Sequence, residues 1–183
     1  MTPAEARALL SPAITTRGGV WADFGAGEGT FTQALAELLG PDSRIIAVDR
    51  DASAVAALDR WASTASAIVL PVRGDFSFSF DPPDATRFDG MLFANSLHYV
   101  RNADEVLARL VAWLKPGGRV VFVEYDRERA NQWVPFPISI DALSTLTDAA
   151  ALSVPTVVAR RPSMYQGELY VAIADRNQTR PIP

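Results

Sequence analysis

Apolar residues follow two spacings along this chain: short continuous runs, and stripes that return every three or four positions. The runs predict strands covered on both faces, and the stripes predict the amphipathic helices that cover them. Predicted strands occupy residues 20–24, 44–48, 67–72, 88–94 and 119–125, and predicted helices occupy residues 2–14, 30–39, 52–61 and 103–114. Strands that alternate with helices in this way indicate an α/β fold with a parallel sheet between helices.

The C-terminal part of the chain has a different pattern. After a predicted helix near residues 140–152 come two β-rich runs, 156–160 and 168–174, with a short polar segment between them. That segment is too short for a helical crossover, so the two strands should pair antiparallel.

Two further patterns complete the predicted layout. The sequence Lys-Pro-Gly-Gly at 115–118 predicts a break before the strand at 119–125, and residues 175–183 predict a frayed tail. The sequence contains no internal repeat and no composition change that would mark a domain boundary. We therefore expect a single domain over residues 1–183.

Composition narrows the classes of function. The 183 residues include no cysteine and one histidine, which excludes thiolate and multi-histidine metal sites. The first residues do not follow a signal-peptide pattern, and no apolar run reaches the roughly 18 to 20 residues that span a bilayer, so we expect a cytoplasmic protein without membrane contact. The net charge of −4 argues against nucleic acid as a partner, although the pairs Arg127/Arg129 and Arg160/Arg161 keep it open.

The most informative segment is the glycine-rich turn after the first predicted strand. Gly25, Gly27 and Gly29 alternate with other residues and lead directly into the helix at 30–39. Glycines in a strand-to-helix turn let the backbone approach a ligand closely. Asp49 ends the next strand, 20 residues past the last of these glycines, where a carboxylate can accept hydrogen bonds from a ribose diol. A charge at the start of the following helix is the alternative role for Asp49. The two signals together predict a nucleoside-containing cofactor.

A nicotinamide-binding domain is the first alternative for this cofactor. Its motif, G-x-G-x-x-G, places the third glycine where this chain has Thr30. A nicotinamide domain would also tend to finish on parallel strands rather than an antiparallel pair. An NAD-dependent oxidoreductase is therefore the weaker hypothesis.

With these segments the chain resembles the class I S-adenosylmethionine-dependent methyltransferases over nearly its whole length. Five segments carry the resemblance in the family's order: residues 22–29, 48–49, 74–76, 88–100 and 114–120. The resemblance implies a Rossmann-like, doubly wound, seven-stranded and mostly parallel sheet with an antiparallel C-terminal strand and helices on both faces. It also implies S-adenosyl-L-methionine as cofactor and S-adenosyl-L-homocysteine as product.

The resemblance further implies which residues hold the cofactor. Asp23 would attract its ammonium directly or through water, Asp49 its ribose, and Asp75 its adenine, with Phe76 alongside. A turn-forming role for Asp75 and a strand-end cap for Asn95 are the structural alternatives. The predicted cofactor-binding set is Asp23, Gly25, Ala26, Gly27, Gly29, Asp49, Arg50, Asp75, Phe76 and Asn95.

The sequence says less about the residues that bind the methyl acceptor. His98 follows the strand at 88–94 and is a candidate general base, with packing at the start of the next helix as its alternative. Tyr99, Trp133 and Phe136 are candidate substrate-lining residues. Few residues precede the first strand, so we expect no large N-terminal lid, which leaves open a bigger acceptor, an open cleft, or a homodimer whose second subunit covers the site.

Two missing motifs bear on the acceptor. The segment Asn95-Ser96-Leu97-His98 is not the Asn-Pro-Pro-Tyr-like run of enzymes that methylate amino groups of nucleic acids and proteins. Lys115 is the single lysine, too few for the catalytic set of ribose methylation. We therefore expect methyl transfer to a small molecule, with a non-catalytic cofactor-binding module of the same fold as the alternative.

Overall fold

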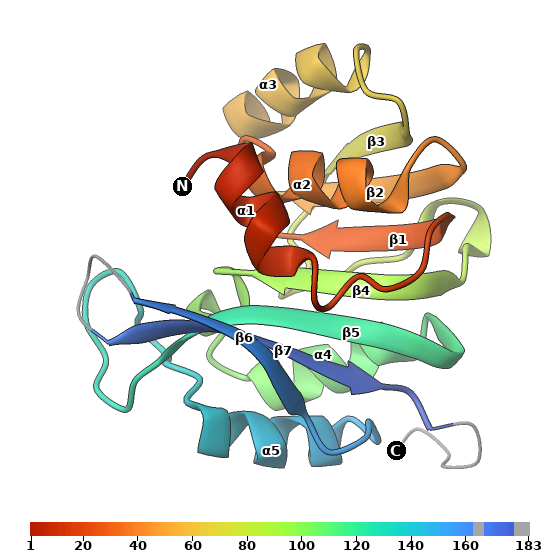
Figure 1. Cartoon of the computed structure of the whole chain (residues 1–183). Coiled ribbons are helices and arrows are strands. Elements are labelled where there is room, and N and C mark those ends of the chain that lie inside the picture. Colours follow the sequence, from red (N-terminus) through yellow and green to blue (C-terminus); the bar gives the residue numbers. More distant parts are fainter. Residues whose placement is uncertain (163–166, 178–183) are drawn as a thin grey trace.

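All seven strands of the computed structural model, which describes residues 1–162 and 167–177, form one sheet (Figure 1). The strand order is β3-β2-β1-β4-β5-β7-β6. The pairs from β3 to β5 are parallel, and β7 is antiparallel to both of its neighbours. The strands are β1 (Gly19–Phe24), β2 (Ser43–Asp49), β3 (Ile68–Arg73), β4 (Phe88–Ala94), β5 (Leu114–Asp126), β6 (Thr156–Pro162) and β7 (Glu168–Asp175). This arrangement confirms the predicted fold class, including the antiparallel pairing of the last two strands.

Helices cover both faces of the sheet. Buried residues of α1, α2 and α3 belong to one apolar cluster, and those of α4 and α5 belong to a second cluster on the other face. The helices are α1 (Pro3–Leu10), α2 (Thr30–Leu39), α3 (Ala52–Ala62), α4 (Ala103–Val111) and α5 (Ile140–Ala149), with short 3₁₀ turns η1 (Pro83–Ala85) and η2 (Leu97–Tyr99). Among the helices of the described ranges, none has the length and apolar character needed to cross a membrane.

The core explains why the central strands are continuous apolar runs. Alternate residues of β1 enter opposite clusters, with Trp21 on one face and Phe24 on the other. Phe24 stacks on Phe93 of β4 at a centroid distance of 5.2 Å, and Phe93 stacks on Phe122 of β5 at 6.1 Å. These three buried rings join the central strands at the face that α4 and α5 cover.

Several predicted boundaries were wrong, including that of α5, which ends at Ala149 instead of residue 152. The first helix ends at Leu10 instead of residue 14, and α4 ends at Val111 instead of 114. The predicted break at 115–118 lies inside β5: Phe88 pairs with Leu114 and Gly90 with Arg119, so these four residues bulge out of the ladder opposite Asp89. The Lys115 ammonium lies 2.7 Å from the Asp89 carboxylate and attaches this bulge to β4.

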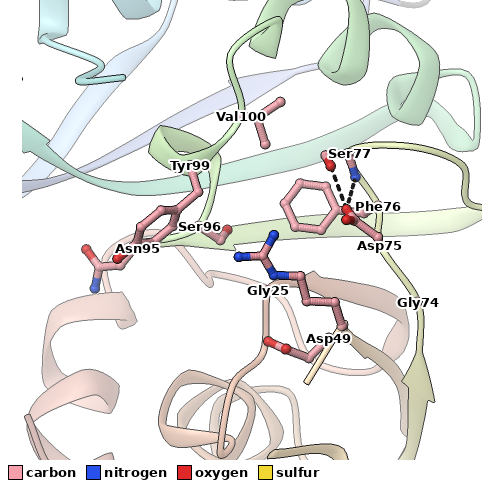
Figure 2. Close-up of a pocket in the computed structure, with 11 residues that line it drawn as sticks. Gly25, Asp49, Gly74, Asp75, Phe76, Ser77, Asn95, Ser96, Tyr99 and Val100 are labelled. Carbon is pink, nitrogen blue, oxygen red and sulfur yellow. Dashed lines mark hydrogen bonds between the residues drawn. The ribbon is translucent and has the colours of Figure 1, made fainter. Parts of the chain in front are cut away.

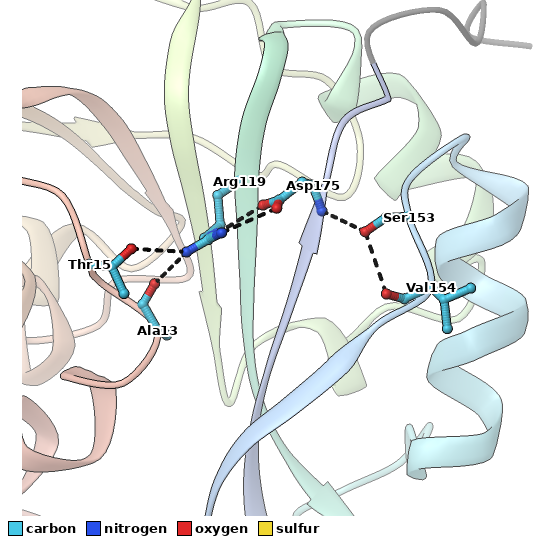
Figure 3. Close-up of polar contacts among 6 residues, drawn as sticks. All are labelled: Ala13, Thr15, Arg119, Ser153, Val154 and Asp175. Atoms are coloured by element: carbon cyan, nitrogen blue, oxygen red, sulfur yellow. Dashed lines mark hydrogen bonds and ion pairs between the residues drawn. The ribbon is translucent and has the colours of Figure 1, made fainter.

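The end of the chain is also more ordered than predicted. Arg119 donates to both carboxylate oxygens of Asp175, at 2.8 and 3.1 Å, and to the carbonyl oxygen of Ala13 (Figure 3). Arg176 forms a β-bridge with Leu152. The frayed tail predicted from residue 175 was therefore wrong for these two residues, because the ion pair and the bridge hold them against the sheet. The rest of that prediction, at 178–183, lies outside the described residues, as do residues 163–166.

Candidate active site

Two adjoining cavities lie at the ends of the parallel strands. The first, of about 210 Å³, is lined by loops that follow β1, β2, β3 and β4 (Figure 2). Its lining residues are Gly25, Asp49, Arg50, Gly74, Asp75, Phe76, Ser77, Asn95, Ser96, Tyr99 and Val100. The sheet order reverses between β1 and β4, and ligands of open α/β sheets bind in the crevice outside such a reversal.

A second cavity, of about 240 Å³, meets the first at Asn95 and Tyr99, which line both. Aromatic and amide side chains dominate its walls, together with one arginine and His98. Its lining residues are Asn95, His98, Tyr99, Tyr125, Arg127, Asn131, Trp133 and Val134. The site therefore consists of two compartments, with Asn95 and Tyr99 at their junction.

The glycine-rich turn is fastened to β2. The N–H groups of Gly25 and Ala26 donate to the carbonyl oxygen of Val48 at 2.8 and 3.0 Å. Gly27 N–H donates to Oδ2 of Asp49 at 2.7 Å, and Gly29 N–H donates to the Ala26 carbonyl oxygen. The N–H groups expected to approach a cofactor are thus mostly engaged within the protein. What this turn offers a ligand is proximity of the backbone and the Asp49 carboxylate.

Two glycines of the turn have different roles. A Cβ at Gly25, where φ is +82°, would lie 2.4 Å from the Ser96 Cβ, so this glycine lets the turn pack on the end of β4. Around Gly27, where φ is +53°, no atom of the described chain lies within 4 Å of a Cβ built there. The space beside Gly27 is open for a ligand.

Asp23 carries a buried carboxyl with one unsatisfied oxygen. Its Oδ2 accepts from the Thr32 hydroxyl at 2.6 Å, whereas Oδ1 has no hydrogen-bond partner in the described part of the chain. Burial raises the pKa of Asp23 to about 7; the Thr32 hydrogen bond acts in the opposite sense, and the charge of Asp49 adds to the increase. A buried acceptor without a donor, two residues before the turn, fits a cationic ligand group.

Asp49 and Asp75 are the acidic side chains of the first cavity. Asp49 accepts from the N–H groups of Gly27 and Asp51, and it is Asp51 that caps α3 through the N–H groups of Ser53 and Ala54. Asp49 therefore lies just before the N-cap of α3 and makes no capping bond to that helix itself. Asp75 does form a turn, because its Oδ1 accepts from the N–H and hydroxyl of Ser77, and it lines the cavity as well.

The junction of the two cavities contains two more unsatisfied polar atoms. Within the described residues, Oδ1 of Asn95 and Oγ of Ser96 are buried without a hydrogen-bond partner. Asn95 has a φ of +53°, a conformation that few non-glycine residues adopt and that often marks functional sites. Among the residues that the structure describes, Oδ1 of Asn95 therefore caps neither the end of β4 nor the turn that follows. In Figure 2, Asn95 and Tyr99 lie across the cavity from Asp75 and Ser77.

His98 forms a buried pair with a residue that the sequence reasoning missed. Its Nδ1 lies 2.5 Å from Oε2 of Glu124 on β5, and the other carboxylate oxygen of Glu124 accepts from the N–H groups of Leu97 and His98. The only hint in the sequence was one acidic residue directly after the apolar run Val120–Val123. A carboxylate on a strand covered on both faces requires a polar partner.

The structure separates the remaining predicted residues. Arg50 and Phe76 line the first cavity, Asn95 and Tyr99 line both cavities, and Trp133 lines the second. Four predicted residues line neither cavity: Asp23, Ala26, Gly27 and Gly29. Phe136 also lines neither: its N–H donates to the His98 carbonyl oxygen, and its ring lies under the Arg101 guanidinium at 5.0 Å.

Comparison with known proteins decides the family. A family model described as "Methyltransferase domain" matches residues 22–120, the segment from the glycine-rich turn to β5. The chain belongs to this family. Membership of this family agrees with the S-adenosylmethionine cofactor that the motifs in the sequence imply.

Individual relatives of this methyltransferase domain are distant. The ubiquinone/menaquinone biosynthesis C-methyltransferase UbiE of Pseudomonas aeruginosa is 28% identical over 114 residues, 60% of this chain and 43% of that protein. A protein-L-isoaspartate O-methyltransferase of Triticum aestivum is 30% identical over 104 residues, 54% of this chain and 43% of that protein. The chain thus spans less than half the length of these curated relatives.

A solved structure matches nearly the whole domain. The YcgJ protein from Bacillus subtilis has a TM-score of 0.76 and 14% sequence identity, and the match covers 95% of this chain and 99% of that one. At this identity the likeness supports the fold of the methyltransferase domain.

Proposed function

We propose that this methyltransferase domain transfers the methyl group of S-adenosylmethionine to a small molecule held in the second cavity. The observation that carries the proposal is the pair of cavities that share Asn95 and Tyr99. One compartment has the acidic side chains that suit a nucleoside and its amino-acid part. The other has aromatic side chains and a buried histidine, and its volume of about 240 Å³ suits a small organic molecule.

The cofactor would occupy the first cavity. Asp49 has lone pairs left for the ribose hydroxyls after accepting two backbone N–H groups. Asp75 and Phe76 would hold the adenine, with Arg50 at its edge. The unsatisfied Oδ1 of Asp23 would balance the ammonium, and the open space beside Gly27 would admit the ligand. Each of these residues also appears in the set that the sequence predicts.

The second compartment would position the acceptor and take its proton. When bound, S-adenosylmethionine supplies an electrophilic methyl group on a sulfonium, and a neutral thioether remains after transfer. Asn95 and Tyr99 at the junction would align the acceptor with the first cavity. Where the acceptor has a dissociable proton, His98 would accept it at Nε2, because Glu124 occupies Nδ1. Glu124 would stabilise the imidazolium until that proton passes to water.

Two measurements test this function. Calorimetric titration with S-adenosylhomocysteine should give a saturable isotherm, and its absence at millimolar ligand would contradict the cofactor assignment. A cell extract incubated with the protein and isotope-labelled S-adenosylmethionine should then yield labelled products in the low-mass fraction, identified by mass spectrometry. Label confined to proteins or nucleic acids would contradict a small-molecule acceptor. Binding of S-adenosylhomocysteine without any labelled product would favour the non-catalytic module.

A further inference from the structure

The second cavity is lined by an arginine, Arg127, that forms no ion pair with any described residue. Arg127 lines the cavity directly after the end of β5, and its Nε donates to the Arg129 carbonyl oxygen at 2.8 Å. No carboxylate of the described residues lies within the 4.0 Å of an ion pair with it. The backbone contact holds the guanidinium through Nε, and within the described residues its two terminal nitrogens make no hydrogen bond. This end of an arginine matches the two oxygens of a carboxylate.

Carboxylates are absent from the lining of the same cavity. Its other lining side chains are neutral amides and apolar or aromatic groups, apart from His98. Glu124 approaches the cavity only from behind the imidazole, to which it is bonded. Arg127 also lines a neighbouring hollow together with Asp126, Glu128 and Asp141, but none of these carboxylates forms an ion pair with it. The charge that faces the second cavity is therefore positive, in a chain whose net charge is negative.

The walls of the cavity are aromatic and unusually open to solvent. Tyr99 is 51% exposed and Trp133 is 62% exposed, and Tyr125 lines the cavity with them. The loop that carries Trp133 is fixed, because Asn131 Oδ1 accepts from the N–H groups of Trp133 and Val134 at 2.9 and 2.7 Å. Large aromatic surfaces held in position beside a cavity suit a flat ring.

We propose that the acceptor is an aromatic anion, whose ring lies against Tyr99 and Trp133 and whose carboxylate pairs with Arg127. This inference rests on the proposed function, because it assigns the chemistry of the acceptor. It makes Arg127 the residue that selects for charge, and Trp133 the residue that selects for a flat ring. The amide N–H groups of Asn131, which lines the same cavity, would be a second donor to that carboxylate.

Three small molecules test separately whether binding requires a negative charge and whether it requires a flat ring. They are 4-hydroxybenzoate, its neutral analogue 4-hydroxybenzamide, and cyclohexanecarboxylate, which keeps the charge and lacks the flat ring. Each is titrated by saturation-transfer NMR into the protein, with and without saturating S-adenosylhomocysteine. The hydroxybenzoate should bind at least about 10-fold more tightly than either analogue. Equal affinity for the benzoate and the benzamide, or no signal from the benzoate at 5 mM (~100-fold above a dissociation constant of about 50 μM), would overturn the inference.

Variants locate the effect. Arg127→Gln should reduce benzoate affinity to the level of the benzamide and leave benzamide affinity unchanged. Arg129→Gln is the matched control, since it removes a neighbouring charge but keeps the carbonyl oxygen that Arg127 uses. Trp133→Ala should weaken both aromatic probes alike. An unaltered benzoate affinity in Arg127→Gln, or an equal loss in Arg129→Gln, would reject the role of Arg127.

The same experiment keeps this inference distinct from the function on which it rests. If S-adenosylhomocysteine binds and the benzoate shows no preference, only the aromatic-anion inference fails. If S-adenosylhomocysteine does not bind, the proposed function fails, and the titrations without nucleotide still report whether the cavity prefers an aromatic anion. Thermal denaturation of each variant, compared with the unmodified protein, identifies any loss caused by unfolding.

Discussion

Nδ1 of His98 lies 2.5 Å from Oε2 of Glu124, and both side chains are almost completely buried. The partners come from different elements, the 3₁₀ turn η2 and the strand β5, and Glu124 also accepts the backbone N–H groups of that turn. One carboxylate therefore fixes both the turn and the ring that it carries. If His98 acts as a base, Glu124 sets its orientation and its tautomer.

Replacing Glu124 tests this relationship. Glu124→Gln keeps the size of the side chain and removes the charge that would stabilise the imidazolium, so turnover should fall by roughly 100-fold. His98→Ala should reduce turnover at least as much. The affinity for S-adenosylhomocysteine should stay the same in both variants, because neither residue lines the first cavity. A purely structural pair would instead lower the melting temperature and leave the turnover of the folded fraction intact.

The role of Asp49 in cofactor binding can be tested with the nearby Asp51 as a control. Asp49→Ala should weaken S-adenosylhomocysteine binding by about 1.5 to 3 kcal/mol, the scale of hydrogen bonds to a charged group. Asp51→Asn is the control, since Asp51 caps α3 without lining the cavity and asparagine is also a good cap. Titration calorimetry compares the two dissociation constants. An unchanged value in Asp49→Ala would contradict the ribose assignment.

The two glycines of the turn should respond differently to substitution. Gly25→Ala puts a methyl group 2.4 Å from the Ser96 Cβ at a positive φ, so it should lower the free energy of unfolding by about 2 kcal/mol or more. Gly27→Val meets open space, so the fold should survive with the strain of about 1 to 2 kcal/mol expected for its φ, while nucleotide binding is abolished. Denaturant titrations and calorimetry separate the effects. An unchanged affinity of Gly27→Val for S-adenosylhomocysteine would count against the proposed position of the ligand.

Asp23 makes stability depend on pH with a defined sign. Its pKa rises from an ordinary value of 3.8, which applies to the unfolded chain, to about 7 in the folded protein, so folding favours the protonated carboxyl. Its contribution to stability is complete below about pH 4 and is lost as the pH rises through 7, by on the order of 4 kcal/mol. Asp23→Asn does not titrate there, so its stability relative to the unmodified protein should increase between pH 4 and pH 8. Denaturant titrations across that range measure the difference, and a constant difference would refute the protonated state.

The carboxyl of Asp23 also couples the binding of S-adenosylhomocysteine to the release of a proton. A ligand ammonium beside Oδ1 favours the ionised form of Asp23, so S-adenosylhomocysteine should bind more tightly as the pH rises from 6 to 8 and should release a proton near pH 6.5. Calorimetry in two buffers with different ionisation enthalpies measures the released proton. Asp23→Asn should bind more weakly and without this dependence on pH. A binding constant of the unmodified protein that is flat over this range would separate Asp23 from the ammonium.

The features that the sequence predicts best are those fixed by local chemistry. Alternating apolar runs and stripes place all seven strands within a few residues, and the glycine turn and Asp49 mark the first cavity directly. The bulge at 115–118 escaped prediction because it depends on Lys115 meeting Asp89, a contact between residues far apart in the chain. Glu124 escaped for the same reason: its partner is 26 residues away, and no local pattern indicates that the two will meet.

Arg127 and the divided cavity lay beyond sequence reasoning for a related cause. Whether an arginine faces solvent, a carboxylate or a cavity depends on how its loop folds over the sheet edge. Nothing in the sequence distinguishes Arg127 from Arg129. In the structure, Arg127 lines the second cavity, whereas Arg129 does not line it and contacts Arg127 through its backbone carbonyl oxygen.

The insertion of β7 between β5 and β6 dictates an order of assembly. β6 precedes β7 in the chain, yet its ladder partner in the sheet is β7. Until residues 168–175 leave the ribosome, β5 presents an open edge and β6 has no strand beside it. The nascent chain therefore cannot finish its sheet progressively, and closure of the β5 edge waits for the strand that is synthesised last among the seven.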